Sequence, residues 1–166
     1  SSVSDPYCNT KDKKILSEVL NDYDQETVDF HDWTVRYTQE ELSSLISEKL
    51  KMDFGRIKAI EPLERGKSGR ISLLKIAGEK RTFTIGKELE IRKVLSNTHL
   101  YSSAFTVDTP ELDKDGYPVT FVLNGHGWGH GVGLCQVGAA VMGAKGIAYN
   151  DILAHYYNGA TIEKVW

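Results

Sequence analysis

Long apolar runs, an excess of basic residues and a set of cysteines are all missing from this 166-residue sequence. No apolar stretch approaches the roughly 18 residues that a membrane-spanning helix needs, so we expect no transmembrane segment. The 20 basic residues are outnumbered by 23 acidic ones, which argues against a nucleic-acid partner. The two cysteines, Cys8 and Cys135, cannot define a disulfide framework, and whether they pair stays open.

The overall composition is that of a folded globular protein. Hydrophobic residues make up 40% of the sequence and charged residues 26%, which excludes intrinsic disorder. The chain contains neither an internal repeat nor a Pro/Ser-rich linker, and its length suffices for a core without metals or disulfides. We therefore predict a single domain over residues 1–166.

The first third of the chain predicts two helices and a strand between them. Residues 12–22 carry apolar residues at helical spacing. Residues 30–37 are rich in β-branched and aromatic residues that alternate with polar ones, which is typical of a strand. Thr38 and Glu41 stand three residues apart in front of an apolar stripe, and this capping box predicts the start of the second helix.

The rest of the chain predicts an α+β fold with a largely antiparallel sheet and several short helices. Short turns separate three strand-like segments at residues 57–61, 71–76 and 81–85, which favours an antiparallel meander. Further elements are expected as a helix at 87–95, strands near 105–107 and 119–123 around a turn at 113–117, helices at 133–145 and 149–157, and a closing strand at 161–165.

Glycines are concentrated in one segment of the sequence. Eight of the fifteen lie between Gly125 and Gly146, at every second position in the first part of that range. Such alternation suits neither strand nor helix, and it presents the intervening side chains on a bare main chain. These side chains are His126, Trp128 and His130, with Gln136 following at the start of a helix. An indole that stacks, with imidazoles and an amide that form hydrogen bonds, predicts a carbohydrate-binding or proton-handling surface.

The glycine-rich segment allows other interpretations. A phosphate-binding loop is rejected because the lysine and hydroxyl residue of a P-loop are missing. A metal site on His126, His130 and Cys135 is not expected, because the glycines prevent the helix that would align two histidines. We expect Cys135 to be a reduced, largely buried helix residue rather than a nucleophile. For His126 and Trp128, a structural role inside the fold remains an equal alternative to a role in binding.

The residues from Gly127 to Ala139, which read GWGHGVGLCQVGA, strongly resemble the terminal signature of the stage II sporulation protein D family, also called the amidase-enhancer family. Ser68-Gly69-Arg70 and the stretch from Glu90 to Phe105 match the same family in order and spacing. The resemblance covers nearly all of the chain, as the C-terminal part of the family's domain. It implies a protein of the bacterial cell envelope, outside the cytoplasm, that acts on peptidoglycan glycan strands without a cofactor. Some family members resemble lytic transglycosylases, and others enhance a cell-wall amidase.

The catalytic glutamate of the family has no counterpart here. In the family it lies in an upstream Gly/Ser-Glu-Met-Pro segment, and neither Met52 nor Met142 follows a glutamate. The histidine and cysteine zinc cluster of some members also lies upstream, and Cys135 stands where many members carry serine. We therefore assign no catalytic residue. Three interpretations remain: part of a glycan-cleaving enzyme, a non-catalytic peptidoglycan-binding or amidase-stimulating module and, third, a hydrolase built on Cys135.

Overall fold

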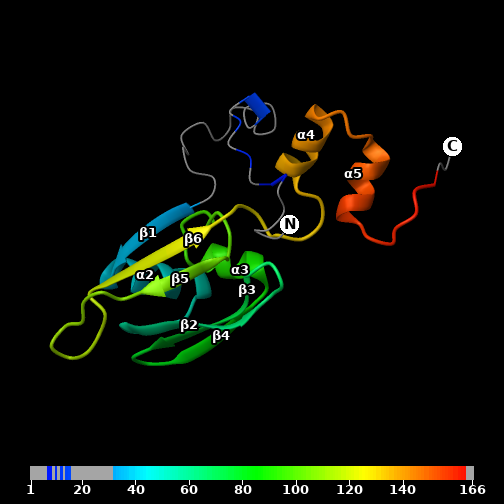
Figure 1. The fold of residues 1–166 in the computed structure, drawn as a ribbon. Helices are drawn as coiled ribbons and strands as arrows, with labels where there is room; N and C mark the ends of the chain where they lie inside the picture. The colour runs from blue at the N-terminus through cyan, green and yellow to red at the C-terminus, as the bar shows by residue number, and fades with distance from the viewer. Residues whose placement is uncertain (1–6, 9, 11, 13, 16–31, 164–166) are drawn as a thin grey trace. The chain divides into compact units, whose positions relative to one another are not determined.

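The structure is a computed structural model that describes residues 7, 8, 10, 12, 14, 15 and 32–163 (Figure 1). The chain divides into two compact units. The sheet unit comprises Asp29–His130, and the helical unit comprises Ser1–Val28 together with Gly131–Trp166. Antiparallel sheets and short helices make up the described elements, so the predicted α+β class is confirmed. The single domain over residues 1–166 stays a prediction.

The first sheet of the sheet unit contains β1 (Asp32–Thr38), β6 (Thr120–His126) and β5 (Phe105–Asp108) in the order β1-β6-β5. Both pairings are antiparallel, and Gly125 of β6 lies opposite Trp33 on one side and Phe105 on the other. A Cβ atom at Gly125 would come within 2.1 Å of the Trp33 indole. Glycine at this position therefore allows the indole to pack directly on the β6 backbone.

The second sheet is the predicted meander. Its strands are β2 (Ile57–Arg65), β3 (Ile71–Gly78) and β4 (Thr82–Gly86), paired antiparallel in chain order. Strands β2 and β3 extend four and two residues beyond their predicted ends, and β4 is shifted by one residue, but the order, the direction and the turns agree.

Helix α2 (Gln39–Leu50) begins at the predicted capping box. The Glu41 N–H donates to Thr38 Oγ1 over 3.2 Å, and the Thr38 N–H donates to Glu41 Oε2 over 2.8 Å. These two bonds satisfy backbone donors that the helix itself leaves free. The helix buries its apolar stripe, whose fully or nearly buried members are Leu42, Leu45 and Ile46.

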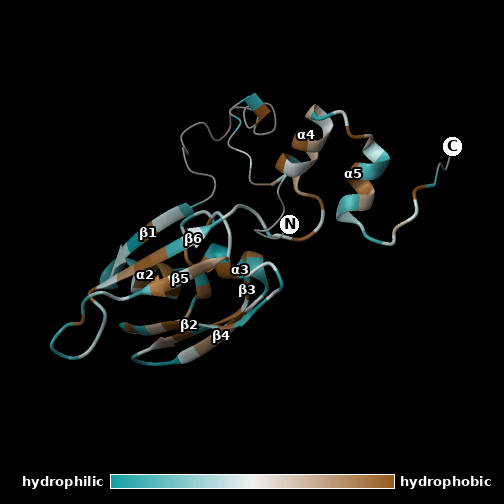
Figure 2. Ribbon diagram, viewed as in Figure 1, coloured by the Kyte–Doolittle hydropathy of each residue, from teal (hydrophilic) through white to brown (hydrophobic). Residues whose placement is uncertain are grey.

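Helix α3 (Glu88–Val94) forms where the sequence predicts a helix at 87–95. Ile91 and Val94 are buried, whereas Leu89 is 45% exposed. Hydrophobic residues recur along the strands and helices of the sheet unit (Figure 2). The core cluster takes all of its members from residues 42–123, and its largest fully buried side chains are Phe54, Phe105 and Phe121.

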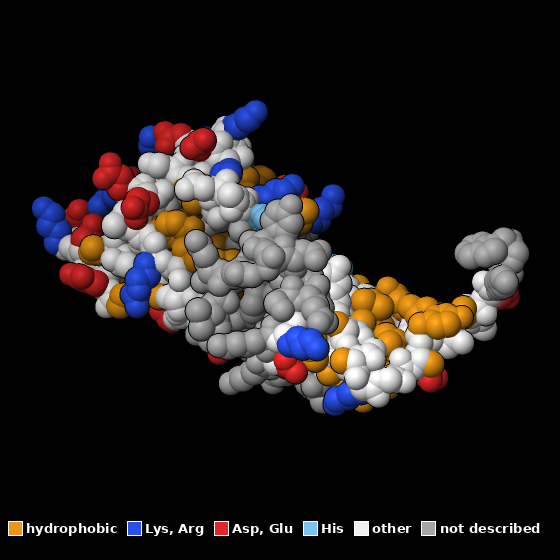
Figure 3. Space-filling model, turned by 90° about the horizontal axis from the view of Figure 1, so that it is seen from above, with side chains coloured by type: hydrophobic (Ala, Val, Ile, Leu, Met, Phe, Trp, Pro, Cys, Tyr) orange, Lys and Arg blue, Asp and Glu red, His pale blue; other side chains and the backbone are white. Residues whose placement is uncertain are grey.

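The helical unit contains α4 (Gln136–Ala144) and α5 (Tyr149–Tyr156). Val141 and Met142 of α4 are buried, while no residue of α5 is. Figure 3 shows hydrophobic side chains gathered over this unit. Val132, Tyr149 and Ile162 are exposed at 69%, 69% and 51%.

Three sequence predictions in this unit have different outcomes. The helix predicted from residue 133 begins at residue 136, because Gly133 has a φ of +79° and Cys135 is extended. The closing strand predicted at 161–165 is wrong for residues 161–163, which are exposed and belong to no strand; the remainder lies outside the described residues. The predicted helix at 12–22 is described only at residues 12, 14 and 15, of which 14 and 15 are helical. None of the helices in the described part of the chain has the length and apolar character required to cross a bilayer.

Candidate functional site

Strand β6 leads directly into the glycine loop, which we define as residues 126–130. Gly127 and Gly129 have φ angles of +68° and +70°, in the left-handed region where other residues are strained. The backbone therefore alternates between two conformations from one residue to the next. This alternation separates the side chains of His126, Trp128 and His130 along the loop, as the glycine pattern predicts.

Arg70 holds the outer part of the glycine loop. This side chain is only 7% exposed, and it reaches the loop from the start of β3. Arg70 Nε donates to the Gly129 carbonyl over 2.8 Å, and Nη2 donates to the Trp128 carbonyl over 2.9 Å. Because the guanidinium is planar and has fixed donor directions, it holds two successive peptide groups in one orientation.

The inner part of the glycine loop is held by two other side chains. Ser102 Oγ donates to the His126 carbonyl over 2.7 Å, and Trp33 Nε1 donates to the Gly127 carbonyl over 3.3 Å. The His126 N–H in turn donates to the Ala104 carbonyl over 2.9 Å. Together with the bonds from Arg70, every carbonyl from residue 126 to residue 129 accepts a hydrogen bond from a side chain. The loop is thus fixed through hydrogen bonds to its backbone.

A series of aromatic rings connects the core to the glycine loop. Ring centroids are 6.2 Å apart between Phe105 and Trp33, 5.9 Å between Trp33 and Tyr101, and 5.1 Å between Tyr101 and Trp128. Phe105 is 1% exposed, whereas Trp128 is 37% exposed. Gly129 N–H donates to the Tyr101 carbonyl over 2.8 Å and fixes the outermost pair. The series therefore ends in an indole that rests on a tyrosine ring and faces solvent.

The structure brings three of the four predicted site residues into one loop of the sheet unit. His126 is half-buried, and Trp128 and His130 are exposed, so none of the three is a fully buried core residue. Gln136 is exposed in the first turn of α4, in the helical unit. A common site that includes Gln136 stays a prediction.

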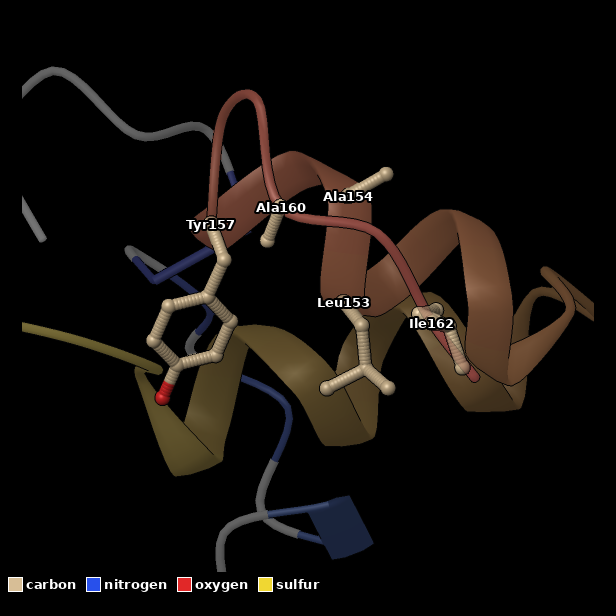
Figure 4. A pocket seen from close by; sticks show the side chains of 5 residues that line it. All are labelled: Leu153, Ala154, Tyr157, Ala160 and Ile162. Carbon is tan, nitrogen blue, oxygen red and sulfur yellow. The ribbon is translucent and has the colours of Figure 1, made fainter. Parts of the chain in front are cut away.

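A pocket in the helical unit does not include any of the predicted site residues. Its cavity volume is about 110 Å³, and it is open to solvent on one side. Its lining consists of Leu153, Ala154, Tyr157, Ala160 and Ile162 (Figure 4). The lining side chains are apolar apart from the Tyr157 hydroxyl, which points away from the other four (Figure 4). The pocket therefore does not test the predicted binding surface of the glycine-rich segment, which stays a prediction.

Cys135 differs from its expected role. It is half-buried rather than largely buried, and it precedes α4 as the N-cap, where its Sγ accepts a hydrogen bond from the Gly138 N–H over 3.4 Å. The apolar neighbours in the sequence suggested packing, but the helix begins one residue later and turns the sulfur towards its own first turn. In the described part of the chain, no three His, Cys, Asp or Glu side chains gather closely enough to hold a metal ion. That no metal is used remains a prediction.

The carboxyl groups of Glu41 and Asp113 have lowered pKa values, which is the direction opposite to that of a catalytic acid. Hydrogen bonds from the backbone N–H and the hydroxyl of Thr38 hold the pKa of Glu41 below its usual value. The backbone N–H of Tyr117, as the largest cause, lowers the pKa of Asp113. A general acid near neutral pH needs a raised pKa, so neither group fits that role.

Sequence reasoning missed the residues that hold the glycine loop. Arg70 lies in a segment that resembles the family, but its partners are 58 and 59 positions away in the sequence. Trp33 lies 94 positions from the carbonyl to which it donates. A glycine-rich loop signals that buried side chains elsewhere donate hydrogen bonds to its carbonyl groups. No local sequence pattern identifies which side chains these are.

Residues 1–133 match a family described as "Domain of unknown function (DUF8618)". The chain is also 35% identical over 79 residues to "Stage II sporulation protein D" of Bacillus amyloliquefaciens, a match that covers 48% of this chain and 21% of the relative. The protein of the same name from Bacillus subtilis (strain 168) is 34% identical over 79 residues, again 48% and 21%. "Amidase enhancer" of Bacillus subtilis (strain 168) is 34% identical over 73 residues, which cover 44% of this chain and 9% of the relative. The matched segments thus span about a fifth of these relatives or less.

Proposed function

Because the chain belongs to the family described as "Domain of unknown function (DUF8618)" and is distantly related to stage II sporulation protein D and amidase enhancer, we propose that it acts in remodelling the bacterial cell wall outside the cytoplasm. Within that role, the glycine loop binds the glycan strands of peptidoglycan. The names of the two kinds of relative support a role at the cell wall. The geometry of the glycine loop supports the proposal that it binds glycan strands.

The observation that carries the proposal is the exposed Trp128 indole on a backbone held from beneath. The faces of sugar rings are largely apolar C–H surfaces, which pack against a flat aromatic ring. The neighbouring imidazoles of His126 and His130 can donate or accept hydrogen bonds with hydroxyl and N-acetyl groups. Since the loop carbonyls are already bonded, binding does not have to order the loop, and that raises affinity.

Cleavage of the glycan would need a carboxylic acid at the bound sugar. In a lytic transglycosylase such an acid protonates the glycosidic oxygen and then assists the muramoyl 6-hydroxyl in its attack on C1. Residues 124–136 contain no aspartate or glutamate. The proposed contribution of this chain is therefore binding, and the acid of a complete enzyme would come from outside these 166 residues.

Sedimentation with purified peptidoglycan sacculi tests the proposal. We expect Trp128→Ala to lower the affinity about tenfold or more, because aromatic anchors dominate such interfaces. Trp128→Phe should retain a larger share of binding. Phe83→Ala is the matched control: Phe83 is another aromatic residue of the sheet unit, 40% exposed compared with 37% for Trp128. Equal binding by Trp128→Ala and Phe83→Ala would contradict the proposal.

Product analysis separates binding from cleavage. Incubation of sacculi with this chain should release no anhydro-muropeptides, whatever amount is bound. Their detection by mass spectrometry would show that the chain carries its own catalytic acid. If the chain increases the rate at which a cell-wall amidase cleaves peptidoglycan, and Trp128→Ala abolishes this increase, glycan binding by the loop serves to stimulate the amidase.

A further inference from the structure

Two thiols from opposite ends of the sequence lie against the first turn of α4, within the helical unit. Cys8 Sγ is 3.8 Å from the Tyr156 hydroxyl. A Cβ atom built at Gly138 would come within 2.8 Å of that same Cys8 Sγ and within 2.0 Å of the Tyr156 hydroxyl. On the same residue, the Gly138 N–H donates to Cys135 Sγ over 3.4 Å.

Gly138 therefore gives a limit on the distance between the sulfur atoms. The backbone nitrogen of Gly138 and the position that a Cβ atom would take on this residue are about 2.5 Å apart by standard bond lengths. The two sulfur atoms are then no more than about 9 Å apart, although the two cysteines are 127 positions apart in the sequence. The absence of a side chain at Gly138 is what admits Cys8 to this turn.

We propose that Cys8 and Cys135 are a redox-active pair that closes to an intramolecular disulfide when the chain meets a disulfide oxidant. The Cys135 thiolate, at the positive end of the α4 dipole, attacks one sulfur of the oxidant and expels its other half as a thiol. The Cys8 thiolate then attacks Cys135 Sγ and releases the second half. The protein loses two protons and two electrons, and the oxidant is reduced to two thiols.

The consequence is a covalent link between residue 8 and the start of α4. A disulfide that closes a long loop stabilises a protein mainly by restricting the unfolded chain. The helical unit gains most from it, because α5 buries no residue of its own. We expect the melting temperature of the helical unit to rise on oxidation and to fall again when a dithiol reductant is added.

Oxidised glutathione is the probe for the test. Wild-type chain should lose about 2 Da in intact mass, carry no glutathione, and yield one linked peptide pair that contains Cys8 and Cys135. Cys8→Ser and Cys135→Ser should instead each retain one glutathione on the remaining thiol. Stable glutathione adducts on wild type, or disulfide dimers at micromolar concentration, would overturn the pairing.

Gly138→Ala and Gly143→Ala form a matched pair on the same helix. The methyl group at position 138 meets Cys8 and Tyr156, whereas no residue that the structure describes lies within 4 Å of one at position 143. We expect Gly138→Ala to slow intramolecular closure at least severalfold and Gly143→Ala to leave its rate unchanged. Equal rates in the two variants would contradict the proposed geometry. If Gly138→Ala loses α4 by circular dichroism, the wild-type and serine-variant masses alone decide.

Discussion

The sheet unit and the helical unit differ in what they bury. The hydrophobic core cluster of the described chain lies entirely within residues 42–123 of the sheet unit. In the described part of the helical unit, Val141 and Met142 are the buried hydrophobic residues, and Val132 and Tyr149 are each 69% exposed. The sheet unit is therefore stabilised by apolar burial. In the helical unit, the absence of a side chain at Gly138 allows Cys8 and Tyr156 to approach α4 closely.

This difference explains how the glycine loop can be both open and fixed. A segment with glycine at every second position cannot hold its own conformation, because glycine loses the most backbone freedom on folding. The sheet unit supplies what the loop lacks, through buried donors and a series of aromatic rings. Order in the loop is thus a property of the core beneath it.

Among the variants that test this comparison of the two units, we expect Phe121→Ala to change the free energy of unfolding most. Phe121 is fully buried, and its truncation should destabilise the sheet unit by about 3–5 kcal/mol. Tyr149→Ala, at an exposed position of the helical unit, should change stability by no more than about 0.5 kcal/mol. Urea unfolding followed by circular dichroism measures both. Similar losses in the two variants would show that the units do not differ in the way described.

Arg70→Lys sharpens the comparison at the glycine loop. Lysine keeps the charge but cannot donate to two carbonyls with the fixed geometry of a guanidinium. We expect amide hydrogen exchange at residues 127–130 to accelerate and sacculus binding to fall about tenfold, as for the loss of a well-placed anchor. Arg81→Lys, at an exposed position of the same unit, is the control. Unchanged exchange in Arg70→Lys would mean that the loop is held by something else.

Thr38→Ala should have a smaller effect, confined to the sheet unit. It removes the N-cap of α2 and should cost about 1 kcal/mol. Ser44→Ala, on an exposed position within the same helix, should stabilise slightly, because alanine is the better helix former. A loss of equal size in both variants would show that the cap itself contributes nothing.

The smallest expected effect is a dependence of stability on acid. The pKa values of Glu41 and Asp113 are lowered in the folded chain, from ordinary values of 4.5 and 3.8. Their contribution is present above those values and is lost as the pH falls through the lower folded values. Stability of the sheet unit should thus decline from about pH 4.5 downwards, and Thr38→Ala should flatten the decline. Unfolding curves measured at a series of acid pH values check this, and a stability that rose as the pH fell through this range would contradict the lowered pKa values.

The sequence predicts those parts of the fold whose cause is local. Thr38 and Glu41 are three positions apart, so the capping box can be recognised from neighbouring residues alone. The meander follows from strands joined by short turns, and the glycine loop from alternating residues. Arg70 and Trp33 act on the loop over 58 to 94 positions, and only the folded chain brings such partners together.

The same reason accounts for the error at Cys135. Its apolar neighbours predict burial, but the starting residue of α4 decides where the sulfur points, and the φ of +79° at Gly133 delays that start. Helix boundaries depend on a few backbone angles that hydrophobic periodicity does not report. The proximity of Cys8 to Gly138 is likewise a tertiary contact, for which no sequence signal exists.

Backbone and indole NMR spectra of the chain, titrated with soluble glycan strands released from peptidoglycan, test the role of Trp128 most directly. The indole N–H of Trp128, assigned by its loss in Trp128→Phe, and the amides of residues 126–130 should shift together and saturate with one affinity. Amides of β2, β3 and β4 should stay in place. Saturable shifts confined to other residues, with the Trp128 indole unmoved, would contradict glycan binding by the glycine loop.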